Sequence, residues 1–348
     1  MHRWRHVSEQ LSYRDAGVDL DAADRAKVGL TELVASTADR FTLSELGSFG
    51  GLYQVPDGEG TPVLVSSADG VGTKLKLAFE TGRHDTVGQC LVNHCVNDIL
   101  VQGARPLFFL DYLAVGEMDE DVVKEVVRGV AVGCKENACA LLGGETAQMP
   151  DFYTPGEYDL AGFVVGIVDR DDIVDGSRVE SGDVLVGLDS SGLHTNGYTL
   201  ARRIVFDAMG LSVEDELPGT GRSVSDELLT VHRSYLPVFR GLLGSDDVIH
   251  GLAHVTGGGI PGNLPRVLPD GLGASVDRTS WQVPGVFQSL QDGGNVDRYE
   301  MDRVFNMGIG MIAIVSEDDV QTVTSAAAEH GVGSRVIGRV EPGKGVEY

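Results

Sequence analysis

The sequence predicts an α/β (α+β) protein made of two mixed domains, residues 1–170 and 171–348. Three observations lead to this prediction. Apolar segments of strand length alternate with longer helical segments in both halves of the chain. The 348 residues are enough for two domains that each have a sizeable core. A charged, turn-rich stretch over residues 169–183 separates the halves and marks the expected domain boundary.

The elements of the first half are predicted from apolar runs that lie between turns. Residues 62–67 read as a buried strand, and residues 85–102 read as a helix that ends at Gly103. The expected elements that follow are a strand near 106–116, a helix near 120–136, a strand near 138–143 and an alternating strand over 158–168.

The second half is predicted in the same way. It opens with a strand over 184–188, and the further expected strands lie near 272–276, 309–315 and 335–340. Helices are expected near 195–209, 223–243 and 317–330. A triple glycine at 257–259 precedes Ile260 and Pro261, which suits a loop that enters a helix with proline in its first turn. The N-terminus of such a helix is a candidate anion site.

The composition describes an acidic protein. Fifty-two acidic residues against 27 basic ones give a net charge of −25, and this sign argues against a nucleic-acid partner. Lysines are scarce among the basic residues, which favours adaptation to high salt over a merely acidic mesophilic protein. No apolar run is long enough to span a membrane, and the N-terminus lacks the apolar segment of a secretory signal. We therefore expect a cytoplasmic protein.

The four cysteines do not predict a metal site or a disulfide framework. They are Cys90, Cys95, Cys134 and Cys139, and none of their spacings is CxxC. Cys90 and Cys95 fall in an apolar helix, where a free thiol behaves as a small hydrophobic group. Disulfides are not expected in the cytoplasm.

The segment Asp69-Gly-Val-Gly-Thr-Lys74 is the strongest functional signal. It follows an apolar strand, and its glycines allow backbone N–H groups to approach a phosphate closely while the lysine adds a positive charge. Asp69 suits a magnesium ion that in turn binds phosphate. The GxxxxGK[ST] spacing of a P-loop is absent. Taken alone, the segment is equally consistent with a tight turn.

Three further acids strengthen the interpretation. His94 and Asp98 share one face of the helix over 85–102, and Glu145 ends an apolar strand together with two glycines. Asp111 lies in the middle of a strand, where a buried core acid and a metal ligand are equally consistent with the pattern. We expect Asp69, Asp98, Asp111 and Glu145 to converge and to hold magnesium that bridges nucleotide phosphates.

Several motifs resemble the phosphoribosylformylglycinamidine cyclo-ligase family, also called aminoimidazole ribonucleotide (AIR) synthetases. The matching segments are YRDAGVD (13–19), DGVGTK (69–74), VNDI (96–99), GGETA (143–147), YDLAG (158–162), SSGLHTNGY (190–198) and HVTGGGIPG (254–262). DGVGTK and GGET also occur in a wider ATP-using superfamily that includes selenophosphate synthetase, thiamine-phosphate kinase and a hydrogenase maturation protein. The longer segments narrow the resemblance to the cyclo-ligases.

The resemblance implies an ATP-dependent ring closure of formylglycinamidine ribonucleotide, with ATP and Mg²⁺ required and K⁺ as an additional candidate ion. It also implies a homodimer in which the N-terminal sheets of two copies form a closed barrel. Another kinase-like member of the superfamily and a catalytically silent nucleotide sensor are the alternatives. The implied metal ligands are Asp69, Asp98 and Glu145, and the implied catalytic residues are Lys74, His194 and His254. The implied nucleotide- and phosphate-binding residues are Gly70, Val71, Gly72, Thr73, Lys74, Asn97, Asp111, Asn196, Gly257 and Gly258.

Overall fold

The computed structural model describes residues 30–42, 53, 55–56, 60–244 and 248–348. It contains a four-stranded sheet in the order β1-β4-β2-β3 and a six-stranded sheet in the order β12-β9-β11-β5-β10-β8. The predicted mixed α/β class is confirmed. The strands of the first sheet are β1 Pro62–Gly70, β2 Arg105–Val115, β3 Ala140–Gln148 and β4 Tyr158–Asp169.

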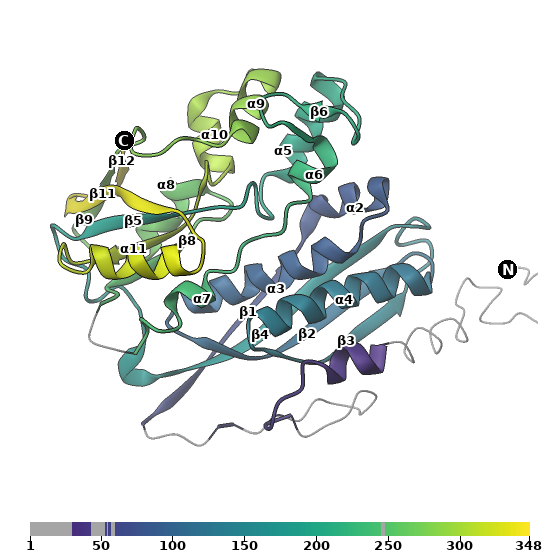
Figure 1. Cartoon of the computed structure of the whole chain (residues 1–348), viewed down its shortest axis with the longest axis horizontal. Helices are drawn as coiled ribbons and strands as arrows, with labels where there is room; N and C mark the ends of the chain where they lie inside the picture. The colour runs from purple at the N-terminus through teal and green to yellow at the C-terminus, as the bar shows by residue number, and fades with distance from the viewer. Residues whose placement is uncertain (1–29, 43–52, 54, 57–59, 245–247) are drawn as a thin grey trace, which may run out of the picture.

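Two helices cover one face of the four-stranded sheet, α3 Asp85–Leu100 and α4 Glu120–Glu136 (Figure 1). Glycines allow these helices to pack closely. A Cβ at Gly88 would collide with the carbonyl oxygen of Val126, and one at Gly129 would collide with that of Asp85. Any larger residue at either position would force the helices apart. The close approach holds α3, and the polar side chains on it, firmly against the sheet.

The opposite face of this sheet carries exposed apolar side chains. Leu64 on β1 is 60% exposed and Phe163 on β4 is 47% exposed. Phe108 on β2 is partly covered by Tyr53, whose ring centroid is 5.4 Å away. Isolated exposed hydrophobic residues are common, but neighbouring ones on a sheet face are typical of an interaction surface.

The second half of the chain builds the six-stranded sheet and the helices around it. Its strands are β5 Val184–Asp189, β8 Gly251–His254, β9 Leu272–Val276, β10 Ile309–Val315, β11 Ser334–Pro342 and β12 Gly345–Glu347. Its α-helices are α5 Tyr198–Arg202, α6 Val224–Leu228, α7 Leu236–Phe239, α8 Gly259–Asn263, α9 Gly285–Gly294, α10 Arg298–Val304 and α11 Val320–Glu329. Short pieces complete it: the π-helix Arg203–Ala208, the 3₁₀-helix Leu264–Arg266 and the hairpin of β6 Glu216–Leu217 with β7 Arg222–Ser223.

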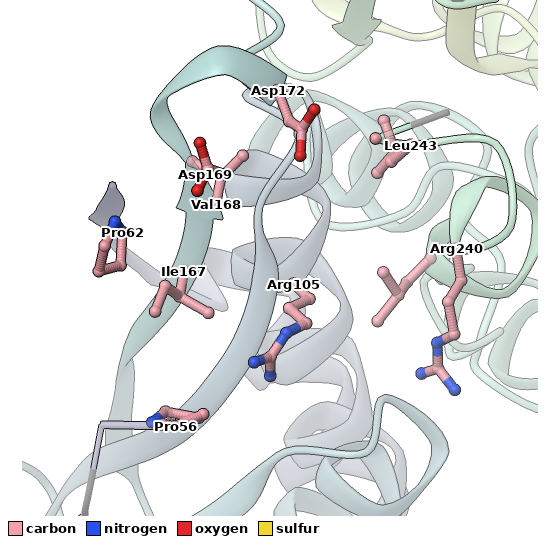
Figure 2. Close-up of a pocket in the computed structure, with 12 residues that line it drawn as sticks. Pro56, Pro62, Arg105, Ile167, Val168, Asp169, Asp172, Arg240 and Leu243 are labelled. Atoms are coloured by element: carbon pink, nitrogen blue, oxygen red, sulfur yellow. The ribbon is translucent and has the colours of Figure 1, made fainter. Parts of the chain in front are cut away.

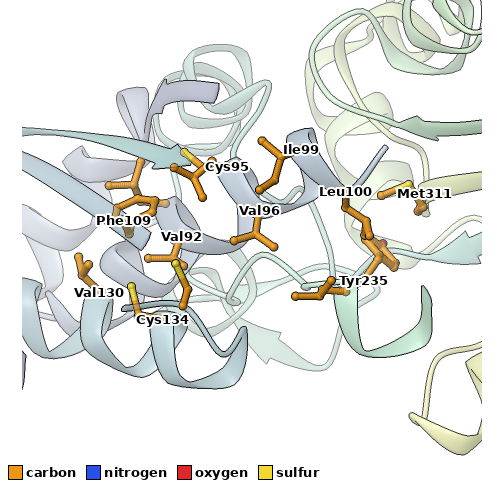
Figure 3. Packing of buried hydrophobic residues seen from close by; sticks show 14 of the residues in the cluster. Val92, Cys95, Val96, Ile99, Leu100, Phe109, Val130, Cys134, Tyr235 and Met311 are labelled. Atoms are coloured by element: carbon orange, nitrogen blue, oxygen red, sulfur yellow. The ribbon is translucent and has the colours of Figure 1, made fainter. Parts of the chain in front are cut away.

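Apolar packing joins the two halves. Figure 3 shows Ile99 and Leu100 at the end of α3, with Leu100 close to Tyr235 and Met311 of the second half. All four side chains are almost fully buried, so the two sheets share one continuous core. The division at residue 170 stays a prediction; it falls in the 3₁₀-helix Arg170–Asp172 between the sheets. Among the described residues, no helix is long and apolar enough to cross a membrane.

The helix predicted over residues 223–243 is wrong. The structure has two short helices there, α6 and α7, joined by an extended segment. The physical reason is hydrogen bonding. The carbonyls of residues 230–233 accept hydrogen bonds from the side chains of Lys74, Ser191, Asn93 and Asn97. A continuous helix would use these carbonyls within itself, so the extended form is the one that can connect the two halves.

A cluster of histidines and aspartates as the candidate active site

Asp69 and Asp98 come together on the helix-covered side of β1. The side chain of Ser67 donates a hydrogen bond to Oδ2 of Asp98 at 3.1 Å. Nε2 of His94 lies 3.0 Å from Oδ2 of Asp69 and 4.0 Å from Oδ2 of Asp98. The helical spacing of His94 and Asp98, and the alternation along β1, place all four side chains at this one spot. Asp69 and Asp98 therefore meet as expected, while their role as metal ligands stays a prediction.

Both carboxylates are held in the charged form. Burial alone would raise their pKa values, but the neighbouring groups outweigh it. The pKa of Asp69 is below its ordinary value because His94 and the N–H of Gly70 bind the carboxylate. The pKa of Asp98 is lowered in the same way by His254, His94 and Ser67. Two anionic groups side by side favour a bound cation.

His254 joins this cluster from the second half of the chain. Its Nδ1 lies 2.8 Å from Oδ1 of Asp98, and its Nε2 lies 3.1 Å from Nε2 of His232. His232 was not predicted as a site residue; the helix expected over 223–243 concealed it. It is fully buried and contacts Thr195, which in turn contacts His94. Three imidazoles and one hydroxyl thus connect the two aspartates.

His194 lies beside these linked side chains, and its backbone is in a strained conformation. Its φ of 63° is rare for a residue with a side chain, and such strain is frequent at functional sites. Its ring stacks on that of His232, with 3.9 Å between centroids. Burial and the positive groups nearby lower the pKa of His194 well below its usual value, so the ring is neutral. Nε2 accepts a hydrogen bond from the N–H of Ser191, and Nδ1 has no partner among the described residues.

Lys74 is fully buried between the two halves of the chain. Its ammonium group donates to the carbonyls of His194 and Thr230, at 2.9 and 2.7 Å, and to Sγ of Cys90 at 3.2 Å. All three ammonium hydrogens therefore have protein acceptors. In this arrangement Lys74 fixes the loop that carries His194.

The rest of the predicted phosphate loop turns toward the second half. Gly70 ends β1, and the N–H of Val71 donates to the carbonyl of Leu160. Gly72 has a φ of 65°, a conformation that glycine adopts readily. The hydroxyl of Thr73 lies 2.8 Å from that of Thr199 on α5. The segment is thus a turn between the two halves, beside the aspartates.

A second predicted set lies at the start of α8. Asn196 and Gly257 are neighbours, because a Cβ at Gly257 would lie 3.6 Å from Nδ2 of Asn196. Oδ1 of Asn196 is buried and has no partner among the described residues. Gly258 has a φ of 100°, as the sharp entry to α8 requires. Asn97 has a different position: it donates to the carbonyl of Arg233 and accepts from the N–H of Tyr235, so it anchors the extended segment.

Asp111 and Glu145 do not join the cluster within one chain, which corrects the expected convergence. Asp111 is buried under the helices, two strands from Asp69 in the sheet, and burial raises its pKa to about 7. Glu145 is exposed. It pairs with Tyr112 and, since neighbouring residues of a strand alternate, it points to the face away from α3 and α4. Its strand, β3, is also at the sheet edge opposite to β1.

The described residues also line a cavity away from this cluster. It has a volume of about 290 Å³ and sits near the start of β1 and the end of β4, at the opposite end of these strands from Asp69 (Figure 2). Arg105, Arg240, Asp169 and Asp172 are among its lining residues. The cluster itself is tightly packed, so a ligand there would bind next to the turn at residues 70–73.

Comparison with known proteins identifies the family. The chain matches the model of the AIR synthase related protein N-terminal domain over residues 50–168 and that of the C-terminal domain over residues 180–348. Among curated proteins, it is 52% identical over 331 residues to the phosphoribosylformylglycinamidine cyclo-ligase of Sorangium cellulosum, covering 95% of each chain. It is 50% identical to that of Geotalea daltonii, again over 95% of each chain.

Solved structures show the same fold at lower identity. A thiamine-monophosphate kinase from Stenotrophomonas maltophilia superposes with a TM-score of 0.69 at 20% identity, over 92% of this chain and 95% of that one. The hydrogenase maturation protein HypE in complex with ATP gives 0.66 at 20% identity, over 94% and 89%. The fold of the chain is therefore shared with these two proteins. Half of the residues are identical to curated cyclo-ligases over nearly the whole length, and the chain belongs to the phosphoribosylformylglycinamidine cyclo-ligase family of enzymes.

Proposed function

We propose that the protein uses ATP to close the imidazole ring of formylglycinamidine ribonucleotide, forming 5-aminoimidazole ribonucleotide, ADP and phosphate. The observation that carries this proposal is the Asp69–Asp98 pair beside the glycine-rich turn, in a chain that is 52% identical to a named cyclo-ligase. The reaction belongs to purine biosynthesis, and a cytoplasmic location is part of the proposal.

The residues of the cluster suit Mg²⁺ and nucleotide phosphates. Carboxylate oxygens are the ligands that Mg²⁺ prefers, and the lowered pKa values keep Asp69 and Asp98 ionised. A bound Mg²⁺ would neutralise charge on the phosphates of ATP. The N–H groups of Gly72 and Thr73 would face these phosphates. The glycine-rich start of α8, with Asn196 beside it, would bind the phosphate of the ribonucleotide.

The proposed chemistry has two steps. The formamide oxygen of the substrate attacks the γ-phosphate, and ADP leaves. The amidine nitrogen then attacks the activated carbon, phosphate leaves, and the ring closes. His254 holds Asp98 in place, and His194 keeps one buried ring nitrogen, Nδ1, without a partner, which suits a hydrogen bond to the substrate. Lys74 acts through the His194 loop as a positioning residue.

An assay of ADP release tests the function. With ATP, Mg²⁺ and formylglycinamidine ribonucleotide, we expect ADP and aminoimidazole ribonucleotide to form in equal amounts. Thiamine monophosphate and selenide serve as substrates of the alternative kinase-like reactions. ADP release with either of these, and none with the ribonucleotide, would contradict the proposal. Binding of ATP without turnover on any substrate would favour a nucleotide sensor.

We also propose a homodimer that forms through the open face of the four-stranded sheet. Leu64 and Phe163 lie exposed there, and Glu145 points to this side, where it would reach a metal only across such an interface. Light scattering should report about twice the chain mass of 37.0 kDa. Phe163→Glu should give inactive monomers, whereas Tyr299→Glu, at an exposed aromatic site on α10, should stay dimeric. A fully active monomer would contradict the proposed assembly.

The acidic surface supports adaptation to high salt. At a net charge of −25, repulsion between carboxylates destabilises the folded state, and salt screens this repulsion. We expect the melting temperature to rise as KCl increases from about 0.1 M into the molar range, where the screening length falls to about 3 Å. Sucrose of equal osmolality is a control for non-ionic effects. A melting temperature that stays flat or falls with KCl would contradict the adaptation.

A further inference from the structure

The short helix α5 brings the second half of the chain against the glycine-rich turn at residues 70–73. The hydroxyl of Thr199 lies 2.8 Å from that of Thr73 in the turn. The ring of Tyr198 lies beside Lys74, the residue after the turn, with 5.1 Å between Nζ and the ring centroid. Tyr198 and Thr199 therefore mark the side of α5 that faces the turn.

Arg202 lies on the same side of α5. It follows Tyr198 by four residues and Thr199 by three, and residues at these two spacings share one face of a helix. Helical side chains also lean toward the N-terminus of their helix, so the side chain of Arg202 is directed back over the turn that holds Tyr198 and Thr199. A π-helix begins at the next residue, and π-helical turns are frequent at functional sites.

The guanidinium group of Arg202 lacks a protein partner. The side chain is half-buried, its Nε is fully buried, and it forms no ion pair or side-chain hydrogen bond with the described residues. The chain has 52 acidic residues against 27 basic ones, and Arg335 and Arg339 pair with carboxylates at 2.7 and 2.6 Å. A cation withdrawn from water without a partner is unfavourable, and an anion bound beside it removes that penalty.

We propose that Arg202 binds a phosphate group of ATP from the second half of the chain, while Asp69 and Asp98 hold the metal in the first half. The inference rests on the proposed function, which places the phosphates of ATP at the glycine-rich turn. A guanidinium group donates two parallel hydrogen bonds to phosphate oxygens. Positive groups that hold a transferring phosphoryl group stabilise the charge that develops on it.

The position of Arg202 favours ATP over the ribonucleotide as the source of the phosphate. α5 touches Thr73 directly, whereas the ribonucleotide phosphate is proposed at the start of α8. Lys74 cannot supply this charge, because its three ammonium hydrogens already have protein acceptors. Arg202 therefore provides the cation that the motif of the turn assigned to the lysine.

Calorimetric titration of the full-length protein with ATP and Mg²⁺, without the ribonucleotide, tests the proposal. Arg202→Gln should weaken ATP binding by about 10- to 100-fold, because a charge-assisted pair of hydrogen bonds is lost. Arg202→Lys should lose less than about tenfold, since the charge stays and the planar fork does not. Arg128→Gln is the matched control: Arg128 is exposed on α4, also has no ion pair among the described residues, and should leave ATP binding unchanged.

Steady-state kinetics and thermal melts separate phosphate binding from a structural role. Arg202→Gln should raise the KM for ATP by a similar factor and change the KM for the ribonucleotide less than about threefold. Without ATP, its melting temperature should stay the same or rise, because a charge without a partner is removed. Unchanged ATP affinity, or a rise in KM for the ribonucleotide alone, would overturn the proposal.

The wild-type protein provides a second test if the variants do not fold. Phenylglyoxal modifies arginine side chains, and peptide mass spectrometry locates the modified residues. ATP should protect Arg202 from modification and leave Arg128 reactive, while the ribonucleotide alone should protect neither; absence of protection by ATP would contradict the proposal. The assay of ADP release keeps the two ideas apart. Turnover with ATP affinity independent of Arg202 would leave only the function standing, and Arg202-dependent ATP binding without turnover would leave only the phosphate contact.

Discussion

Asp98→Asn should lower turnover by at least about 100-fold while the protein remains folded. The introduced amide keeps an oxygen that can accept from Ser67 and has the same shape as the carboxylate next to His254, so the packing changes little. What the variant loses is a negative charge that the environment keeps ionised, since the pKa of Asp98 is below its ordinary value. Without that charge, a cation and the phosphates it binds are held less tightly in the transition state.

The measurement is the rate of ADP release at saturating ATP and formylglycinamidine ribonucleotide, over a range of Mg²⁺ concentrations. Asp183→Asn is the control, because Asp183 is likewise an aspartate paired with a histidine, His250, and lies outside the cluster. We expect the control to keep near-normal turnover. If Asp98→Asn kept near-normal turnover at saturating Mg²⁺, Asp98 would not be a metal ligand. A thermal melt of the variant shows whether a loss of turnover comes from the active site or from unfolding of the protein.

Local patterns predicted the part of the site that depends on local geometry. The four-residue spacing of His94 and Asp98 was sufficient to put both on one face of α3, and the strand before Asp69 brought that acid to the same place. The glycine-rich loops at His194 and His254 were identified by motif. These loops meet α3 only because the second sheet packs on the end of the first, and such long-range packing is not encoded in any single segment.

The parts that were missed depend on contacts between distant segments. Glu145 was expected at the end of an apolar strand near 138–143, but β3 continues through it to Gln148, and the alternation along the strand places its side chain on the face away from α3 and α4. The pairing of β2 with β3 also has a register shift after Phe109, and no local sequence pattern predicts such a shift. His232 was not predicted as a site residue because its segment has the composition of a helix. Only the side-chain donors of the other half, among them Asn93 and Lys74, keep that segment extended.

Lys74→Met should lower the stability of the protein by about 3 kcal/mol, because it leaves two buried carbonyl oxygens, those of His194 and Thr230, without donors. Methionine fills a similar volume, so the loss comes from hydrogen bonding and charge more than from a cavity. For domains of this size, such a loss corresponds to a fall in melting temperature of roughly 6 to 12 °C. The His194 loop should also lose its position, and turnover should fall with it.

Lys76→Met provides the comparison two residues away. Lys76 is 41% exposed and pairs with Glu157 at 2.5 Å on the surface, where an ion pair contributes about 1 kcal/mol or less. We therefore expect a shift of melting temperature below about 3 °C and normal turnover. Calorimetry of the two variants at the same salt concentration checks the prediction. If both variants melted alike, the carbonyls of His194 and Thr230 would have other donors, and Lys74 would be free to bind phosphate as the loop motif alone suggested.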